Sequence, residues 1–263
     1  MNPTVFDVVN LLEAWAPAAT AEAWDNVGLQ VGRWESAINT VLISLDVDES
    51  VLAHAREIGA GLIISHHPVL FRPVVAVDDH TLAGRLVLGA AEGGVALFAA
   101  HTNLDRAAGG VNDALCDALG LQAMQVGGEQ IGRLAQLDEA IPLGDWAALV
   151  RSRLAAHTVR VTGAADRRVQ RVYVLSGAGR SEIDAALACN ADVLLTGELG
   201  YHDAQKALYA GLSVVEAGHY ETEAPVLRTI EKHLQMEFQR LQYKIRTVVW
   251  EQSTCPFWYV CGH

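Results

Sequence analysis

Histidines and carboxylates recur in this sequence directly after short apolar segments. Six residues share this placement, and each of the two carboxylates lies four residues after a histidine: His66, His67, His101 with Asp105, and His219 with Glu223. Imidazole nitrogens and carboxylate oxygens are common ligands of divalent metals. A single histidine after a strand is more often a hydrogen-bonded loop residue, but six such groups need a reason to converge. The pattern therefore predicts a metal site.

The adjacency of His66 and His67 favours two metal ions over one. Neighbouring side chains on an extended segment point to opposite sides, so the pair serves one ion only if the chain turns, which Pro68 favours. Two neighbouring ions remove this constraint, because each imidazole can bind its own ion while a carboxylate such as Glu223 bridges both. In both histidine–carboxylate segments, the spacing of four brings the pair to one face of a helical turn.

The elements that position these residues are predicted to be parallel strands and helices. Strands are expected at 41–45, 61–65 and 95–99 with helices at 48–59 and 80–92, then strands at 172–175, 192–196 and 213–216 with helices at 181–189 and 202–210. Nearly continuous apolar strands are typical of a parallel sheet covered on both faces. The predicted fold class is therefore α/β. In such sheets, ligands bind beyond the carboxyl ends of the strands, where the histidines lie.

The two halves of the sequence align with each other. Segment 41–68 matches 172–199 at an offset of 131 residues, and His101–Asp105 matches His219–Glu223 at an offset of 118. These matches predict an internal duplication that produced two related βαβ-type domains, residues 1–126 and 127–263, with the metal site between them. The boundary is expected in the glycine-rich segment 126–132.

Composition excludes several classes of protein. The chain has 263 residues, of which 51% are hydrophobic and 19% charged, so it is not disordered. The net charge of −12 disfavours general nucleic-acid binding. Apolar segments are too short to span a membrane, and the first residues do not resemble a signal peptide, so we expect a cytoplasmic protein. Four cysteines without a C-x-x-C pair are expected to be free thiols.

Five motifs in the sequence resemble the Nif-three-like family, whose members are often labelled GTP cyclohydrolase type 2 homologues. In family order they are Trp24-Asp25-Asn26-Val27-Gly28-Leu29, Ser65-His66-His67-Pro68, His101-Thr102-Asn103-Leu104-Asp105, Gly197-Glu198 with His202, and Gly218-His219 with Glu223. The resemblance spans nearly the whole chain. It implies a dinuclear site in which one ion is bound by His67, Asp105 and Glu223, and the other by His66, His219 and the shared Glu223. His101 is then a neighbour of the ions.

The resemblance also implies a ring-shaped homo-oligomer, commonly a hexamer. The short connection between the halves implies the form of the family that lacks an inserted middle domain. One departure concerns the glycine-rich junction, where the family usually has a glycine two residues after the arginine. Here Arg133 is followed by Leu134 and Ala135, which argues against a role for this loop in substrate contact.

The expected chemistry is metal-assisted hydrolysis. Two neighbouring divalent ions can deprotonate a water near neutral pH and polarise the bond that it attacks. The ligand types suit zinc, manganese, iron, cobalt or nickel equally. His101, if it is not a ligand, is the candidate proton shuttle. The family label suggests a nucleotide-like substrate, and the alternative is a non-enzymatic, oligomeric metal-binding or interaction protein.

Three weaker features complete the sequence picture. Segment 176–181 lies between a strand and a helix, where its amides could hold an anion or only form a tight turn, and Arg72 is a second candidate anion contact. The segment 24–28 has the composition of a simple turn. Near the C-terminus, Cys255, Cys261 and His263 could bind a soft metal, but a terminal strand that packs its aromatic residues is the preferred interpretation.

Overall fold

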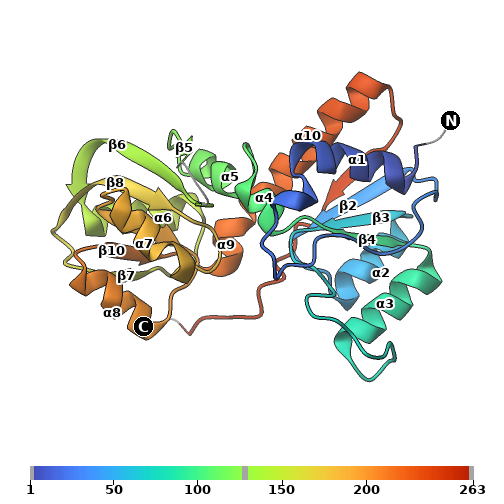
Figure 1. The fold of residues 1–263 in the computed structure, drawn as a ribbon, viewed down its shortest axis with the longest axis horizontal. Coiled ribbons are helices and arrows are strands. Elements are labelled where there is room, and N and C mark those ends of the chain that lie inside the picture. Colours follow the sequence, from blue (N-terminus) through green and yellow to red (C-terminus); the bar gives the residue numbers. More distant parts are fainter. Residues whose placement is uncertain (1–2, 126–129, 261–263) are drawn as a thin grey trace. The chain divides into compact units, whose positions relative to one another are not determined.

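The computed structural model describes residues 3–125 and 130–260, and the chain forms two compact units (Figure 1). The first unit comprises the chain through Ala108 together with Leu227–Thr254, and the second comprises Gly109–Val226 together with the segment from Cys255. The predicted boundary between residues 126 and 127 lies outside the described residues. The compact units meet along the chain between Ala108 and Gly109, and Leu227–Thr254 returns to the first unit, where its strand joins the first sheet.

The first unit contains a five-stranded sheet in which four strands are parallel. Its order is β1 (Gly28–Val31), β4 (Ala96–Ala99), β3 (Leu62–Ser65), β2 (Thr40–Ser44) and β11 (Arg246–Val249). Strands β11, β2, β3 and β4 run parallel, and β1 pairs with β4 in the antiparallel direction. The three predicted strands of the first half are therefore confirmed, with their carboxyl ends at one edge.

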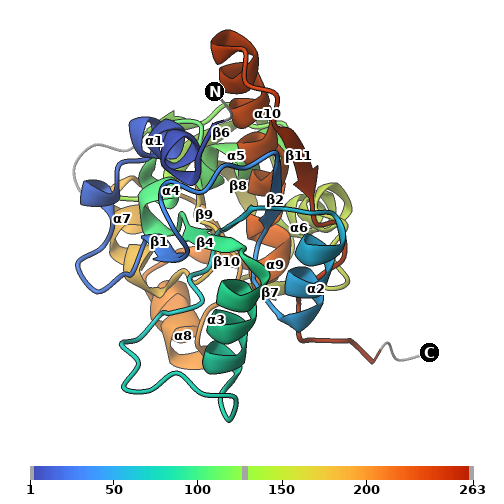
Figure 2. The same cartoon turned by 90° about the vertical axis from the view of Figure 1, so that its right-hand side faces the viewer.

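Helices cover both faces of the first sheet. They are α1 (Val5–Trp15), α2 (Glu49–Glu57), α3 (Leu82–Gly93), the short α4 (Thr102–Arg106), α10 (Pro225–Leu241) and the 3-10 turn Ala18–Thr20. Helices α1 and α10 lie on one face, and α2 and α3 lie on the other (Figures 1 and 2). On the second face, Leu42, Ile63 and Leu97 pack against these two helices. Their strand neighbours Ile43 and Ile64 are also fully buried, as expected for a sheet covered on both sides.

The second unit contains a six-stranded sheet with a parallel centre. Its order is β5 (Met124–Gln125), β6 (Arg133–Pro142), β8 (Arg168–Val174), β9 (Val193–Thr196), β10 (Ser213–Glu216) and β7 (Arg160–Thr162). Strands β8, β9 and β10 are parallel, whereas β5, β6 and β7 pair in the antiparallel direction. The helices are α5 (Val111–Ala118), α6 (Leu143–Arg153), α7 (Ile183–Ala188), α8 (Tyr201–Tyr209) and α9 (His219–Glu223), with a 3-10 turn at Arg180–Glu182.

The strand register supports the predicted duplication. Val41 of β2 pairs with Leu62 of β3, and the residues 131 positions later, Val172 and Val193, pair in the same way. Each parallel group also ends at an antiparallel edge strand, β1 beside β4 and β7 beside β10. Two related α/β units are therefore present.

The predicted terminal strand is wrong for the residues that the structure describes. Residues 255–260 form no strand, and the side chains of Phe257 and Trp258 are 66% and 82% exposed. Aromatic content favours a strand only where a neighbouring strand supplies hydrogen bonds, whereas Tyr259 makes a ring contact with His157. Cys261 and His263 lie outside the described residues. Within the described ranges, no helix combines the length and apolar character needed to cross a membrane.

Candidate metal centre

The candidate metal centre of the first unit lies at the carboxyl ends of its parallel strands. His66 and His67 follow β3 directly, and their amides donate to Leu45 O at 3.1 and 2.9 Å. His101 follows β4, and Ala100 N donates to Ser65 O at 2.9 Å, which joins the two segments. Since parallel strands end at the same edge, the three imidazoles meet there.

Each of these imidazoles has its Nδ1 next to an oxygen acceptor. His66 Nδ1 lies 2.9 Å from Ala100 O, His67 Nδ1 lies 2.7 Å from Asp46 Oδ1, and His101 Nδ1 lies 2.8 Å from Asp25 Oδ1. A carbonyl or carboxylate oxygen can only accept, so Nδ1 carries the proton in each neutral ring. The lone pair of each such ring is then on Nε2, which is the arrangement usual for metal-ligating histidines.

The donor atoms are close enough for metal binding. One ring nitrogen from each of His66, His67 and His101 lies within 4.8 Å of the other two. Asp105 adds a carboxylate, because its Oδ1 lies 3.7 Å from His66 Nε2. His66 is fully buried, whereas the His67 and His101 side chains are 25% and 14% exposed, so the group lies at the edge of the protein interior. Three imidazoles and one carboxylate fit a divalent transition metal.

A short helix and the side chains of Asn103 and Asp25 position His101 and Asp105. The amides of Leu104 and Asp105 donate to His101 O at 2.8 and 3.0 Å, which begins α4 and turns Asp105 back toward the centre. Asn103 Oδ1 accepts from His101 N at 2.9 Å, while its Nδ2 donates to Ala16 O at 2.7 Å. The Asn103 side chain therefore ties the backbone at His101 to the backbone at Ala16, which fixes the segment.

Asp25 supports His101 from the opposite side of the ring. Its side chain is fully buried, and Thr102 donates to its Oδ2 from both the amide and the hydroxyl, at 3.1 and 2.5 Å. Burial alone disfavours the ionised form, but the hydrogen bonds from His101 and Thr102 outweigh it and hold the pKa of Asp25 well below its usual range. Asp25 is therefore a carboxylate that orients the His101 ring.

The second unit carries a smaller group of the same kind. In α9, His219 Nε2 lies 3.1 Å from Glu223 Oε1, and His219 Nδ1 lies 3.3 Å from Glu198 Oε1. Gly177 makes room for this pair, because a Cβ at that residue would lie 2.3 Å from Glu223 Oε1 and 3.3 Å from His219 Nε2. Glu223 is buried, and the absence of a side chain at Gly177 lets the Glu223 carboxylate pack against the backbone.

A family model described as Duf34/NIF3 (NGG1p interacting factor 3) matches residues 3–256. The chain belongs to this family. A GTP cyclohydrolase 1 type 2 homolog of Clostridium perfringens is 31% identical over 261 residues, which cover 97% of this chain and 98% of the relative. A protein of the same name from Streptomyces coelicolor is 33% identical over 85% of this chain and 82% of the relative. The crystal structure of a Bacillus cereus protein related to NIF3 has a TM-score of 0.92 at 26% identity and covers 98% of this chain and 99% of its own.

These comparisons confirm the resemblance to the NIF3 family and the α/β fold. The predicted site residues fall into two groups within this family fold. The first unit brings together His66, His67, His101 and Asp105, and the second brings together His219 and Glu223. His101 was expected as a neighbour of the ions, and its ring nitrogen lies among the candidate ligand atoms.

Sequence reasoning missed the side chains that orient the histidines. Asp25 was interpreted as part of a turn, and it does accept from Asn26 N at 2.8 Å, but its main contacts are with His101 and Thr102. Asp46 gave no signal beyond its place one residue after a predicted strand. Glu198 was noted in the Gly197-Glu198 motif and aligns with His67 in the duplicated half, but its contact with His219 was not predicted.

In the 176–181 segment, which the sequence left open as an anion site or a tight turn, three backbone amides donate within the protein. The amides of Ser176 and Gly177 donate to Asn112 Oδ1 and Thr222 Oγ1 at 2.8 and 3.1 Å, and Gly179 N donates to Glu198 O at 3.0 Å. These donors are already engaged by the protein. These contacts favour the tight turn, one of the two alternatives that the sequence left open.

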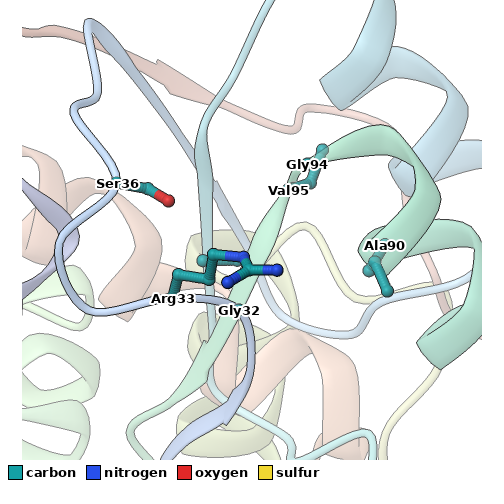
Figure 3. Close-up of a pocket in the computed structure, with 8 residues that line it drawn as sticks. Gly32, Arg33, Ser36, Ala90, Gly94 and Val95 are labelled. Carbon is teal, nitrogen blue, oxygen red and sulfur yellow. The ribbon is translucent and has the colours of Figure 1, made fainter.

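A cavity of about 390 Å³ in the first unit is separate from the metal centre (Figure 3). It is lined by Gly32, Arg33, Ser36, Ala90, Ala91 and the segment 94–96. Strand β4 begins at Ala96, so the cavity lies at its amino end, whereas His101 follows its carboxyl end. The cavity is thus at the opposite end of β4 from the candidate ligands.

Proposed function

We propose that this protein is a metal-dependent hydrolase whose two groups of donors together bind two divalent ions. The observation that carries the proposal is the convergence of three imidazoles in the first unit, each with its Nδ1 next to an oxygen acceptor, which places the ring lone pair on Nε2. In the proposed centre, His66 and His67 are ligands and His101 is their neighbour. Asp105 completes the first group, and His219 and Glu223 supply the second. Glu223 would be shared by the ions, as the family resemblance implies.

The bound ions supply an acidified water and a polarised bond, which is the chemistry of metal-assisted hydrolysis. We propose that His101 accepts a proton from the attacking water at Nε2. The buried carboxylate of Asp25 stands 2.8 Å from His101 Nδ1, where it stabilises the imidazolium that forms. The relatives' names, GTP cyclohydrolase 1 type 2 homolog, support a nucleotide-like substrate. We also propose a hexamer as the assembly.

Metal stoichiometry tests the centre directly. Untagged wild-type protein is equilibrated with trace zinc, manganese, iron, cobalt and nickel, and its metal content is measured by elemental analysis. We expect about two ions per chain in the wild type, and a sharp fall in Glu223→Gln. The control is Glu57→Gln, which changes a carboxylate whose side chain is 79% exposed in α2. Little metal in the wild type would contradict the proposal.

Two spectroscopic readouts distinguish the possible reactions. Opening of a purine ring changes the ultraviolet absorbance of the base, whereas phosphoester cleavage releases phosphate and leaves that spectrum intact. Metal-loaded protein is incubated with guanosine triphosphate, and both signals are followed beside Glu223→Gln and His101→Gln. Turnover that disappears in Glu223→Gln supports a hydrolase. Full metal occupancy without turnover on any substrate of a nucleotide panel would favour the non-enzymatic alternative.

The assembly is tested separately. Light scattering coupled to size-exclusion chromatography is expected to give six times the 28.3 kDa mass of the chain. A monomer or dimer at micromolar concentration would contradict the hexamer without bearing on the metal stoichiometry.

A further inference from the structure

Two exposed aromatic side chains border the metal centre of the first unit. The Trp24 and Phe71 side chains are 60% and 45% exposed, and their ring centroids lie 5.8 Å apart at an interplanar angle of 62°. Both rings also lie near the ring of His101, at centroid distances of 6.1 and 6.3 Å. An aromatic pair beside a metal centre is a natural surface for a planar ligand.

The backbone that carries Trp24 is fixed on both sides. Asp25 accepts hydrogen bonds from His101 and Thr102, and Glu22 N donates to Thr102 Oγ1 at 2.9 Å. The same contacts that orient His101 therefore hold the indole beside it. The exposed indole of Trp24 therefore belongs to a segment that these hydrogen bonds hold in place.

The segment that carries Phe71 is fixed in a similar way. Leu70 N donates to Gln30 Oε1 at 3.0 Å, and Leu70 O accepts from Asn26 Nδ2. Asn26 and Trp24 belong to the same short segment, so the two aromatic residues are tied to one another through hydrogen bonds. A ligand that stacks here meets a surface that needs little ordering, which favours affinity.

A positive charge accompanies the aromatic pair. Arg72 follows Phe71 and is exposed, and it has no ion pair with any residue in the described ranges. Because the net charge of the protein is −12, an exposed arginine next to Phe71 in the sequence favours an anionic group on a ligand that binds there.

We propose that Trp24 and Phe71 form the ring-binding surface of the active site and select substrates with a planar heteroaromatic ring, with Arg72 contacting an anionic substituent. A purine or pyrimidine nucleotide has this combination. The inference rests on the proposed function, because it makes the metal centre the place where the bound molecule reacts. It adds the residues that choose the substrate class.

Calorimetry with matched probes tests the surface. Metal-loaded protein is titrated with guanosine 5′-monophosphate and with ribose 5-phosphate, which has the same phosphate and sugar but no ring. Stacking on one aromatic side chain changes affinity by roughly five- to a hundredfold. We expect wild type to bind the nucleotide at least about tenfold more tightly than the sugar phosphate. Trp24→Leu and Phe71→Leu should each remove most of that preference, while Trp24→Phe retains it.

Two control variants separate the contributions. Trp258→Leu removes an indole that is 82% exposed in the second unit and should leave both affinities unchanged. Arg72→Gln should weaken both probes by a similar few-fold factor, because they share the phosphate. Equal binding of the two probes by wild type, binding of neither, or an unchanged preference in both leucine variants would overturn the inference.

Measurements of the metal content and of the mass of the assembly distinguish a failure of this inference from a failure of the proposed function. Elemental analysis of Trp24→Leu should match the wild type, since Trp24 is not a ligand. If the wild type holds no metal but retains the ring preference, the hydrolase proposal fails and the ring-binding surface stands. If Trp24→Leu changes the mass of the assembly without changing the affinity for guanosine 5′-monophosphate, the aromatic pair is a contact between copies and the inference is wrong.

Discussion

The two units share the order of three parallel strands and an antiparallel edge strand, but they differ in the residues that follow the parallel strands. At three equivalent positions after the first two strands, the first unit has Asp46, His66 and His67, whereas the second has Gly177, Gly197 and Glu198. After the third strand, both units keep a histidine and a carboxylate four residues apart: His101 is the N-cap residue of α4, which contains Asp105, and α9 contains both His219 and Glu223. The duplication therefore keeps this histidine–carboxylate pair in both units, whereas the residues after the other two parallel strands differ.

The glycines of the second unit explain how its pair is accommodated. A Cβ at Gly197 would lie 2.6 Å from Gly177 O and 2.8 Å from the Cα of His219. A side chain at either glycine would thus displace the chain that carries the histidine and carboxylate. The first unit orients its proposed ligands with supporting side chains, whereas the second, beside the one contact from Glu198, packs its proposed ligands closely against Gly177 and Gly197. Variants that remove or add single groups can test this difference.

The largest effect is expected from loss of a first-unit ligand. His67→Gln removes an imidazole whose Nδ1 is held by Asp46, and we expect zinc affinity to fall by more than about a hundredfold, since loss of a supporting group alone costs about ten- to a hundredfold. Competition with a chromophoric chelator measures the affinity. His80→Gln is the control, because the His80 side chain is 88% exposed. Unchanged zinc affinity in His67→Gln would remove this residue from the ligand set.

A single methyl group should disturb the second unit strongly. Gly177→Ala places a Cβ 2.3 Å from Glu223 Oε1 at a residue with φ of +63°, so the carboxylate must move and the backbone is strained by about 1–2 kcal/mol. We expect metal content to fall toward that of Glu223→Gln, as measured by elemental analysis.

Gly59 supplies a closely matched control for this variant. Its φ is +67°, and a Cβ there would meet no atom within 4 Å. In Gly59→Ala, backbone strain should therefore lower the free energy of unfolding measured by chemical denaturation, and the metal content should stay the same. If Gly59→Ala and Gly177→Ala lose metal equally, the loss comes from strain, and the packing argument for Glu223 is wrong.

The supporting carboxylates of the two units should differ in importance. Asp25 is fully buried and lies 2.8 Å from His101 Nδ1, whereas the side chain of Glu198 is 56% exposed and lies 3.3 Å from His219 Nδ1. Asp25→Asn should lower metal affinity or turnover by roughly tenfold or more. Glu198→Gln should change them by only a few-fold, because water screens the exposed contact. Equal effects in parallel chelator titrations would show that the two histidines are supported alike.

The parts of this molecule that the sequence predicts well are those with a local signal. Apolar segments predicted the parallel strands because burial on both faces leaves a continuous run, and the offset of 131 residues is reproduced by the strand register. Histidines at strand ends were found because the topology alone brings them together. Asp25 was missed, since its partner His101 lies 76 residues away in sequence. The position of the C-terminal strand β11 beside β2 is likewise a long-range pairing that no local pattern specifies.

The smallest predicted effect concerns the helices that follow the equivalent parallel strands β2 and β8 in the two units. In the first unit, Asp48 Oδ1 accepts from Val51 N at 2.8 Å and caps α2, whereas α7 of the second unit begins without a side-chain cap. Asp48→Ala leaves the amides of the first turn to water, so the free energy of unfolding should fall by about 1 kcal/mol. Chemical denaturation followed by circular dichroism measures this change, with Asp79→Ala as an exposed control. Because Asp48 follows Asp46 by only two residues, metal content must be measured on the same sample: a stability loss accompanied by metal loss would assign Asp48 to the support of the metal centre instead of to the helix cap.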